Sequence, residues 1–173
     1  MKKTILLLSM TTLAITATMA QTQKNDEEAI RSLTTTLEKG WNAKSGEIFS
    51  SAFADTHDYI VINGFYFSNL TRQGNAFAHQ RLFDGIYKNL DLTIKIDKIQ
   101  YIRPDLVQIT ALAASYPKDS LPADPAAIMT ILAEKKNEDW KIISFHNHSL
   151  SESFAAKTPP VPYKVMYASW YKN

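Results

Sequence analysis

Hydrophobic residues recur with two different periods along the chain, one typical of helices and one typical of strands. Near its start, apolar side chains recur every three or four positions, at Ile30, Leu33, Leu37 and Trp41. This spacing is typical of one face of an α-helix. Asn25 followed by Glu28 has the spacing of a helix N-cap with its reciprocal acid. We therefore expect a helix that starts at Asn25, followed by a short helical turn over residues 48–53.

From His57 the pattern alternates with a period of two, which is typical of a strand. Asn63-Gly64 then favours a tight hairpin before Phe65-Tyr66-Phe67. Thr71 can cap a further helix that carries His79 on its inward face. Three longer strands follow over residues 92–101, 107–113 and 128–135, with a bulge expected near Asp97-Lys98, and a last strand starts at Trp140.

This order of elements predicts an α+β fold, in which a curved antiparallel or mixed sheet wraps the amino-terminal helix as a cone. We expect the open end of the cone to form a pocket. The domain should span residues 21–150. A separate tail, 151–173, begins with an extended proline segment over residues 158–162 and ends with crowded aromatic residues that seldom remain in water.

The last strand ends in Phe145-His146-Asn147-His148. With strict alternation, His146 and His148 share the face of Trp140, whereas Phe145 and Asn147 lie on the other face. We therefore expect His146 to point into the cone.

The first twenty residues predict an export signal, with Lys2 and Lys3 before an apolar stretch and a small-residue cleavage site at Thr18-Met19-Ala20. The stretch is too short and too interrupted by hydroxyl residues for a membrane span of about 20 residues. We expect a bacterial periplasmic or secreted protein without a membrane span after signal removal. The chain has no cysteine, so no disulfide can stabilise the exported product.

Charge argues against a nucleic-acid partner. Loss of Lys2 and Lys3 reduces 19 basic residues to 17, which balance 17 acidic residues. A nucleic-acid surface needs a basic patch, and no cluster of Lys and Arg is present.

Several short segments, in this order and spacing, resemble the SnoaL-like, SgcJ/EcaC-type branch of the nuclear-transport-factor-2-like superfamily: Gly40-Trp41-Asn42, Phe53-Ala54-Asp55, the stretch from Asp58 to Gly64, His79, Trp140-Lys141-Ile142 and Phe145-His146-Asn147. The resemblance covers about residues 26–149 and implies a cone-shaped fold and a homodimer formed through the sheet. Its members include polyketide cyclases, ketosteroid isomerases, small-ligand binders and noncatalytic association domains. The export signal, His148 and the aromatic tail depart from that pattern.

Three residues are candidates for acid–base chemistry in the cone. Asp58 would act as the base, because burial raises a carboxyl pKa, with His79 as its partner and His146 as a further polar group. The structural alternative is that Asp58 caps local backbone, that His79 is a hydrogen-bonded core histidine and that His146 bonds the adjacent strand. Histidine also suits zinc or iron. No metal motif or phosphate-binding loop accompanies these residues, so we expect neither metal nor cofactor.

A set of aromatic residues and one amide would line the pocket: Trp41, Phe53, Tyr59, Phe83, Trp140 and Asn147. For each aromatic residue alone, ordinary core packing is the simpler interpretation. Together they favour a small apolar or aromatic ligand. The sequence thus predicts an exported pocket protein that binds such a molecule, and it leaves open whether the protein also isomerises or cyclises it. The alternative is a noncatalytic dimerisation or interaction module of the cell envelope.

Overall fold

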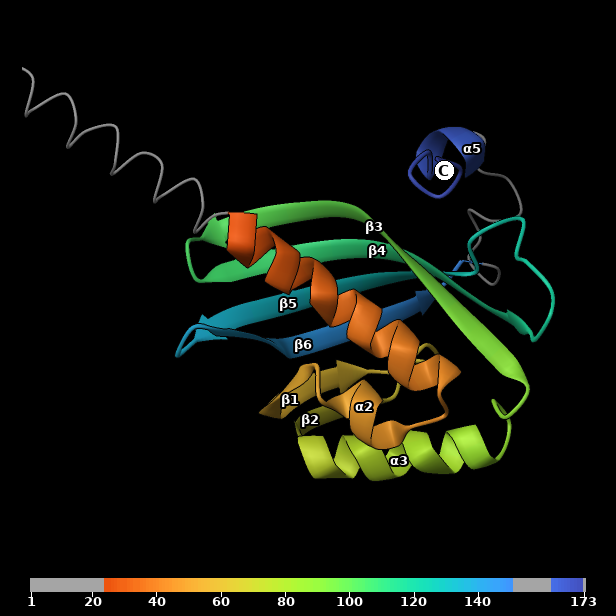
Figure 1. Ribbon diagram of the computed structural model, residues 1–173, viewed down its shortest axis with the longest axis horizontal. Coiled ribbons are helices and arrows are strands. Elements are labelled where there is room, and N and C mark those ends of the chain that lie inside the picture. Colours follow the sequence, from red (N-terminus) through yellow and green to blue (C-terminus); the bar gives the residue numbers. More distant parts are fainter. Residues whose placement is uncertain (1–23, 151–162, 173) are drawn as a thin grey trace, which may run out of the picture.

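The computed structural model describes residues 24–150 and 163–172 (Figure 1). A first helix occupies residues 24–42. The remaining elements follow in the order α2 (Gly46–Ser50), β1 (Phe53–Ile60), β2 (Tyr66–Thr71), α3 (Arg72–Asp84), β3 (Leu90–Arg103), β4 (Leu106–Pro117), β5 (Ala127–Lys136), β6 (Asp139–Ser149) and α5 (Tyr163–Met166). Asn25 is not the N-cap of the first helix, because Lys24 is already helical.

Within the described ranges, six strands form one sheet in the order β2-β1-β6-β5-β4-β3. β1 and β6 pair in parallel, and every other neighbouring pair is antiparallel, so the sheet is mixed. The predicted α+β cone is therefore confirmed. The bulge expected near Asp97 is also present, as a register shift between Ile96 and Lys98. The β1–β2 hairpin has a longer connection than the two residues expected, since Val61 N–H donates to the carbonyl of Phe65 around a left-handed Gly64.

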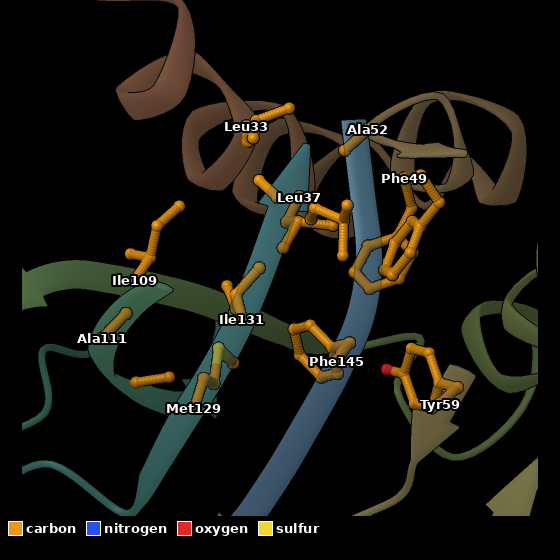
Figure 2. Close-up of a cluster of buried hydrophobic side chains, with 14 of the residues drawn as sticks. Leu33, Leu37, Phe49, Ala52, Tyr59, Ile109, Ala111, Met129, Ile131 and Phe145 are labelled. Carbon is orange, nitrogen blue, oxygen red and sulfur yellow. The ribbon is translucent and has the colours of Figure 1, made fainter. Parts of the chain in front are cut away.

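The first helix packs across the inner face of the sheet (Figure 1). Its apolar stripe of Ile30, Leu33 and Leu37 is buried, as the helical spacing predicted. Figure 2 shows Leu33 and Leu37 facing Ile109 and Ile131 of the sheet. These contacts form the centre of the main hydrophobic core.

Side chains near the end of this helix also form hydrogen bonds with backbone groups of the edge strand β3. Asn42 Nδ2 donates to the carbonyl of Leu92 at 2.9 Å, and its Oδ1 accepts from the N–H of the same residue at 2.7 Å. Glu38 accepts from the N–H of Ile94 at 2.8 Å. Since an unpaired strand edge is open to association, these side chains protect the start of β3.

The described part of the tail, residues 163–172, packs against the opposite, outer face of the sheet. Trp170 is 4% exposed and forms a second apolar cluster with Leu112, Ala114 and Leu150. Lys95 Nζ donates to the Trp170 carbonyl at 2.6 Å. The tail thus finds a partner within its own chain. The predicted signal, 1–20, and the proline segment, 158–162, lie outside the described residues.

Among residues 24–150 and 163–172, no helix combines the length and hydropathy needed to cross a bilayer.

Candidate functional site

A cavity of about 620 Å³ lies within the cone, between the inner face of the sheet, α3 and the β1–β2 hairpin. Its size falls within the range of about 300–1,000 Å³ that is usual for small-molecule sites. Most of its lining is apolar, and its side chains with polar or charged groups are Trp41, Tyr59, Asn75, His79, Arg81, Tyr87, Ser115 and Asn147. Within the described part of the chain, no Asp or Glu lines this cavity.

Helix α3 places two polar side chains, Asn75 and His79, at the cavity. The hydroxyl of Thr71 accepts from the N–H of Gly74 at 3.0 Å and caps the helix, as the sequence predicted. Asn75, His79 and Phe83 follow at intervals of four, so they lie on one face of the helix, and all three are buried.

The neighbouring helix α2 fixes the position of α3. A Cβ at Gly46 would lie 2.1 Å from the carbonyl oxygen of Ala76, so only glycine allows this approach. The close packing brings Phe49 onto the imidazole of His79, with ring centroids 4.1 Å apart.

Four buried side chains form a continuous chain of hydrogen bonds. The His57 Nδ1–H donates to the carbonyl of Ala54 at 3.2 Å, and His57 Nε2 accepts from Asn75 Nδ2 at 2.8 Å. The His79 Nδ1–H donates to the backbone carbonyl of Asn75 at 3.1 Å. A carbonyl can only accept, so in each neutral ring Nε2 is the acceptor. The Tyr59 hydroxyl lies 3.4 Å from His79 Nε2 and donates to it.

Burial keeps this chain uncharged at neutral pH. It lowers the pKa of His79 to about 4, and the opposing hydrogen bond to Asn75 is the smaller effect. Burial also lowers the pKa of His57, although the bond to Ala54 and the charge of Asp58 act in the other direction. The pKa of Tyr59 is raised because burial disfavours the phenolate. The cavity therefore offers neutral hydrogen-bonding groups from these residues rather than ions.

Two amide oxygens of cavity-lining residues have no hydrogen-bond partner among the residues that the structure describes. They are the Oδ1 atoms of Asn75 and Asn147, both buried. Asn75 is fully buried, and both residues line the cavity. Since buried polar atoms are nearly always paired, two unpaired acceptors in one cavity point to a partner other than the described residues.

The structure does not bring Asp58 to His79. His57 and Tyr59 are buried on the inner face of β1, so Asp58 between them points outward. Its carboxylate accepts from the Tyr66 hydroxyl at 3.2 Å and from the backbone N–H of Asn69 at 3.0 Å. This arrangement matches the structural alternative, in which Asp58 binds local backbone.

His146 also points away from the cavity, because β6 changes face part-way along its length. Ser144 pairs with Leu132 but Ile142 pairs with Ala133, which leaves Ile143 as an extra residue in β6. Such a bulge reverses the alternation beyond it. Trp140 and Ile142 are therefore followed on the inner side by Phe145 and Asn147, while His146 and His148 are exposed. The two histidines share a face, as expected, but it is the outer one.

The predicted pocket aromatics divide into two groups. Trp41 and Tyr59 line the cavity, and the Trp41 indole N–H donates to the carbonyl of Leu90 at 2.9 Å. Phe53, Phe83 and Trp140 are core residues that do not line it. Trp140 lies at the other end of the first helix, where its indole N–H donates to Asp26 at 3.0 Å.

Sequence reasoning missed two polar members of the site, His57 and Asn75. A signal for each was present. Asn75 precedes His79 by four residues and so shares its helix face, and His57 precedes Tyr59 by two and so shares its strand face. In the described ranges, no group of three or more His, Cys, Asp or Glu residues is placed to hold a metal ion.

Comparison with known proteins identifies the fold. No protein-family model matches the sequence, and no curated protein matches it significantly. Among solved structures, a cystatin-like domain of unknown function from Nostoc punctiforme is similar, with a TM-score of 0.65 and 24% identity over 72% of this chain and 77% of the other. The chain has the cystatin-like, nuclear-transport-factor-2-like fold.

Two further structures share this fold. A nuclear-transport-factor-2-like protein from Novosphingobium aromaticivorans has a TM-score of 0.62 and 12% identity, over 81% of this chain and 92% of the other. The hexachlorocyclohexane dehydrochlorinase LinA-type3 from Novosphingobium barchaimii has a TM-score of 0.58 and 11% identity, over 75% and 90%. At such identities the likeness concerns the fold alone, and the function must be argued from the cavity.

Proposed function

We propose that this protein is an exported pocket protein of the SnoaL-like type that binds a small, largely apolar, uncharged molecule inside the cone. The observation that carries the proposal is the cavity of about 620 Å³, whose lining is mainly apolar and includes a few buried, uncharged hydrogen-bonding side chains. Such a site excludes water from a ligand and orients it through a small number of polar contacts.

The same features favour binding over isomerisation or cyclisation. A general base works best when its pKa is near the working pH, whereas burial lowers the pKa of His79 to about 4. The carboxylate expected to assist it, Asp58, is bonded to Tyr66 and Asn69 on the outer side of β1. We therefore assign His79 a structural role, in which its two ring nitrogens bond to the Asn75 carbonyl and the Tyr59 hydroxyl and hold both residues at the cavity wall.

A noncatalytic interaction module of the cell envelope could use the apolar surface of the aromatic tail to bind a partner. Trp170 is buried against Leu112, Ala114 and Leu150 of its own chain, so its apolar surface needs no second protein to cover it. The homodimer implied by the resemblance remains a separate prediction. Sedimentation velocity of the purified protein checks it, with a dimer expected and a monomer contradicting it.

Ligand-induced thermal shifts test the pocket. A panel of steroids, polyketides and aromatic compounds should contain molecules that raise the melting temperature of the wild-type protein. Ala78→Trp places a large ring at an exposed lining position of α3 and should abolish these shifts by blocking the cavity. Gln73→Trp is the matched control, because Gln73 is exposed on the same helix but does not line the cavity. A panel without effect, or equal shifts in both variants, would contradict the proposal.

Export is tested by the mass of the mature protein. Expression of the full chain in a bacterial host should give a periplasmic or secreted product that begins at Gln21. A cytoplasmic product that keeps residues 1–20 would refute export without affecting the pocket proposal.

A further inference from the structure

We propose that the ligand carries a neutral hydrogen-bond donor, a hydroxyl or an amide N–H, which it directs at the unpaired amide oxygens of Asn75 and Asn147. The ligand class is therefore an apolar alcohol, phenol or lactam rather than a hydrocarbon, ether or ester. This inference rests on the proposed function and makes it more specific.

The orientation of the Asn75 amide follows from its neighbours. The His57 Nδ1–H is committed to the carbonyl of Ala54, so Nε2 of the neutral ring must accept. Only the NH₂ group of Asn75 can supply that bond, and it does so at 2.8 Å. Oδ1 must then occupy the other side of the amide, where none of the described residues donates to it. The unpaired acceptor is thus a consequence of the histidine tautomer and not of an arbitrary choice between two amide orientations.

The β6 bulge places Asn147 in the cavity. Because Ile143 is the extra residue, Phe145 and Asn147 face inward beyond it. On the adjacent strand, Asn147 pairs with Met129, whose thioether offers no donor. Its Oδ1 is likewise buried and unpaired among the described residues.

Donors are scarce elsewhere in the cavity. The Tyr59 hydroxyl is used by His79 Nε2, and both imidazole N–H groups are used by backbone carbonyls. Arg81 and Ser115 are exposed, so their donors remain accessible to water, and the Trp41 indole N–H is used by the carbonyl of Leu90. The half-buried Tyr87 hydroxyl can donate or accept. The buried polar surface is therefore biased towards acceptors, which are complementary to a ligand that donates.

Selectivity should follow from the cost of leaving these acceptors unpaired. Both oxygens are buried, so an apolar ligand without a donor leaves them unpaired, whereas a hydroxyl or N–H that reaches them forms the missing hydrogen bond. Sites built to bond a hydroxyl or N–H strongly reject analogues that lack it. A preference of at least about tenfold for the donating ligand is the expected scale for one buried hydrogen bond.

A matched pair of probes tests this inference. Calorimetry should show that 1-naphthol binds the wild-type protein at least tenfold more tightly than 1-methoxynaphthalene, which has the same ring but no donor. Asn147→Leu should reduce that preference, as should Asn75→Leu where the variant folds. His148→Leu is the control, since it removes a polar side chain from the exposed outer face of the same strand as Asn147, and it should keep the wild-type preference.

Nuclear magnetic resonance of the wild-type protein tests the same hydrogen bonds without any variant, so the result does not depend on whether a variant folds. The side-chain carbonyl carbon of Asn75 or Asn147 should shift with 1-naphthol and not with the ether. If both probes bind equally and neither carbonyl responds, the donor inference is refuted while the pocket proposal stands. If neither probe binds and the wider panel also fails, the pocket proposal fails and this inference fails with it.

Discussion

Acidification should destabilise this protein through His79, and the size of the effect can be worked out from the structure. The imidazole is 8% exposed, stacks on Phe49 and shares its cavity with no carboxylate among the described residues. Burial lowers its pKa from 6.5 to about 4. Between these two values the unfolded chain binds a proton that the folded chain does not. The free energy of unfolding therefore falls as the pH falls through this window and is fully retained above about 6.5.

The magnitude follows from the width of that window. Each pH unit inside it changes the free energy of unfolding by about 1.4 kcal/mol for one proton. Lowering the pH from 7 to 5 should therefore cost about 2 kcal/mol through His79 alone. The lowered pKa of His57 adds a contribution of the same sign.

Urea denaturation of the wild type and of His79→Gln, at pH 7 and at pH 5, measures this contribution. Gln cannot titrate, so the variant should lose about 2 kcal/mol less than the wild type between the two pH values. His148→Gln serves as the control, because it removes an exposed histidine from the outer face of the sheet and should keep the wild-type pH dependence. Equal pH dependence in the wild type and His79→Gln would show that His79 is not held neutral by burial.

Three further perturbations test other parts of the structure. Gly46→Ala should lower the free energy of unfolding by about 2 kcal/mol in urea denaturation, because its Cβ would meet the carbonyl of Ala76 at 2.1 Å and force α3 to move. Asp26→Asn should weaken the acid dependence of stability. Burial alone would raise the pKa of Asp26, but the hydrogen bonds from Trp140 and Lys135 outweigh burial and lower the pKa. The ionised carboxylate therefore stabilises the fold above its ordinary pKa, and this stabilisation is lost as the pH falls through the lowered pKa. Trp170→Ala should increase the fluorescence of a hydrophobic dye by uncovering Leu112 and Leu150, whereas Val165→Ala, at an exposed position of α5, should not.

Much of the fold was predictable because local patterns and tertiary packing agree. The stripe of Ile30, Leu33 and Leu37 is buried as its spacing indicates, and Thr71 caps α3. The antiparallel pairing of β3 with β4, β4 with β5 and β5 with β6 also follows from the turn signals between these strands. Chain order alone could not show that β1 inserts beside β6 in parallel, since that pairing depends on how the whole sheet closes around the helix.

The site was less predictable because it depends on single-residue register. His79 was placed correctly on the inner face of α3, where helical spacing fixes its direction. Asp58 was misplaced because the inward set of β1 includes His57 and Tyr59, and the sequence does not say which alternate set of a strand faces the core when both contain polar residues. His146 was misplaced because strict alternation was carried through Ile143, where the pairing with β5 inserts an extra residue.

The extra residue in β6, Ile143, determines which side chains of this strand line the cavity. Without the bulge, alternation from Trp140 would bring His146 and His148 inward, and the cavity would gain two titratable rings. With it, the inner face of β6 carries Phe145 and Asn147, which hold no charge at any ordinary pH. The same outcome is reached on α3 by burial, which keeps His79 neutral at pH 7. Strand register and desolvation thus act together to make the buried lining uncharged but rich in acceptors. Such a lining suits a neutral apolar molecule with a hydrogen-bond donor better than an anion, because burying a charge without a partner is costly.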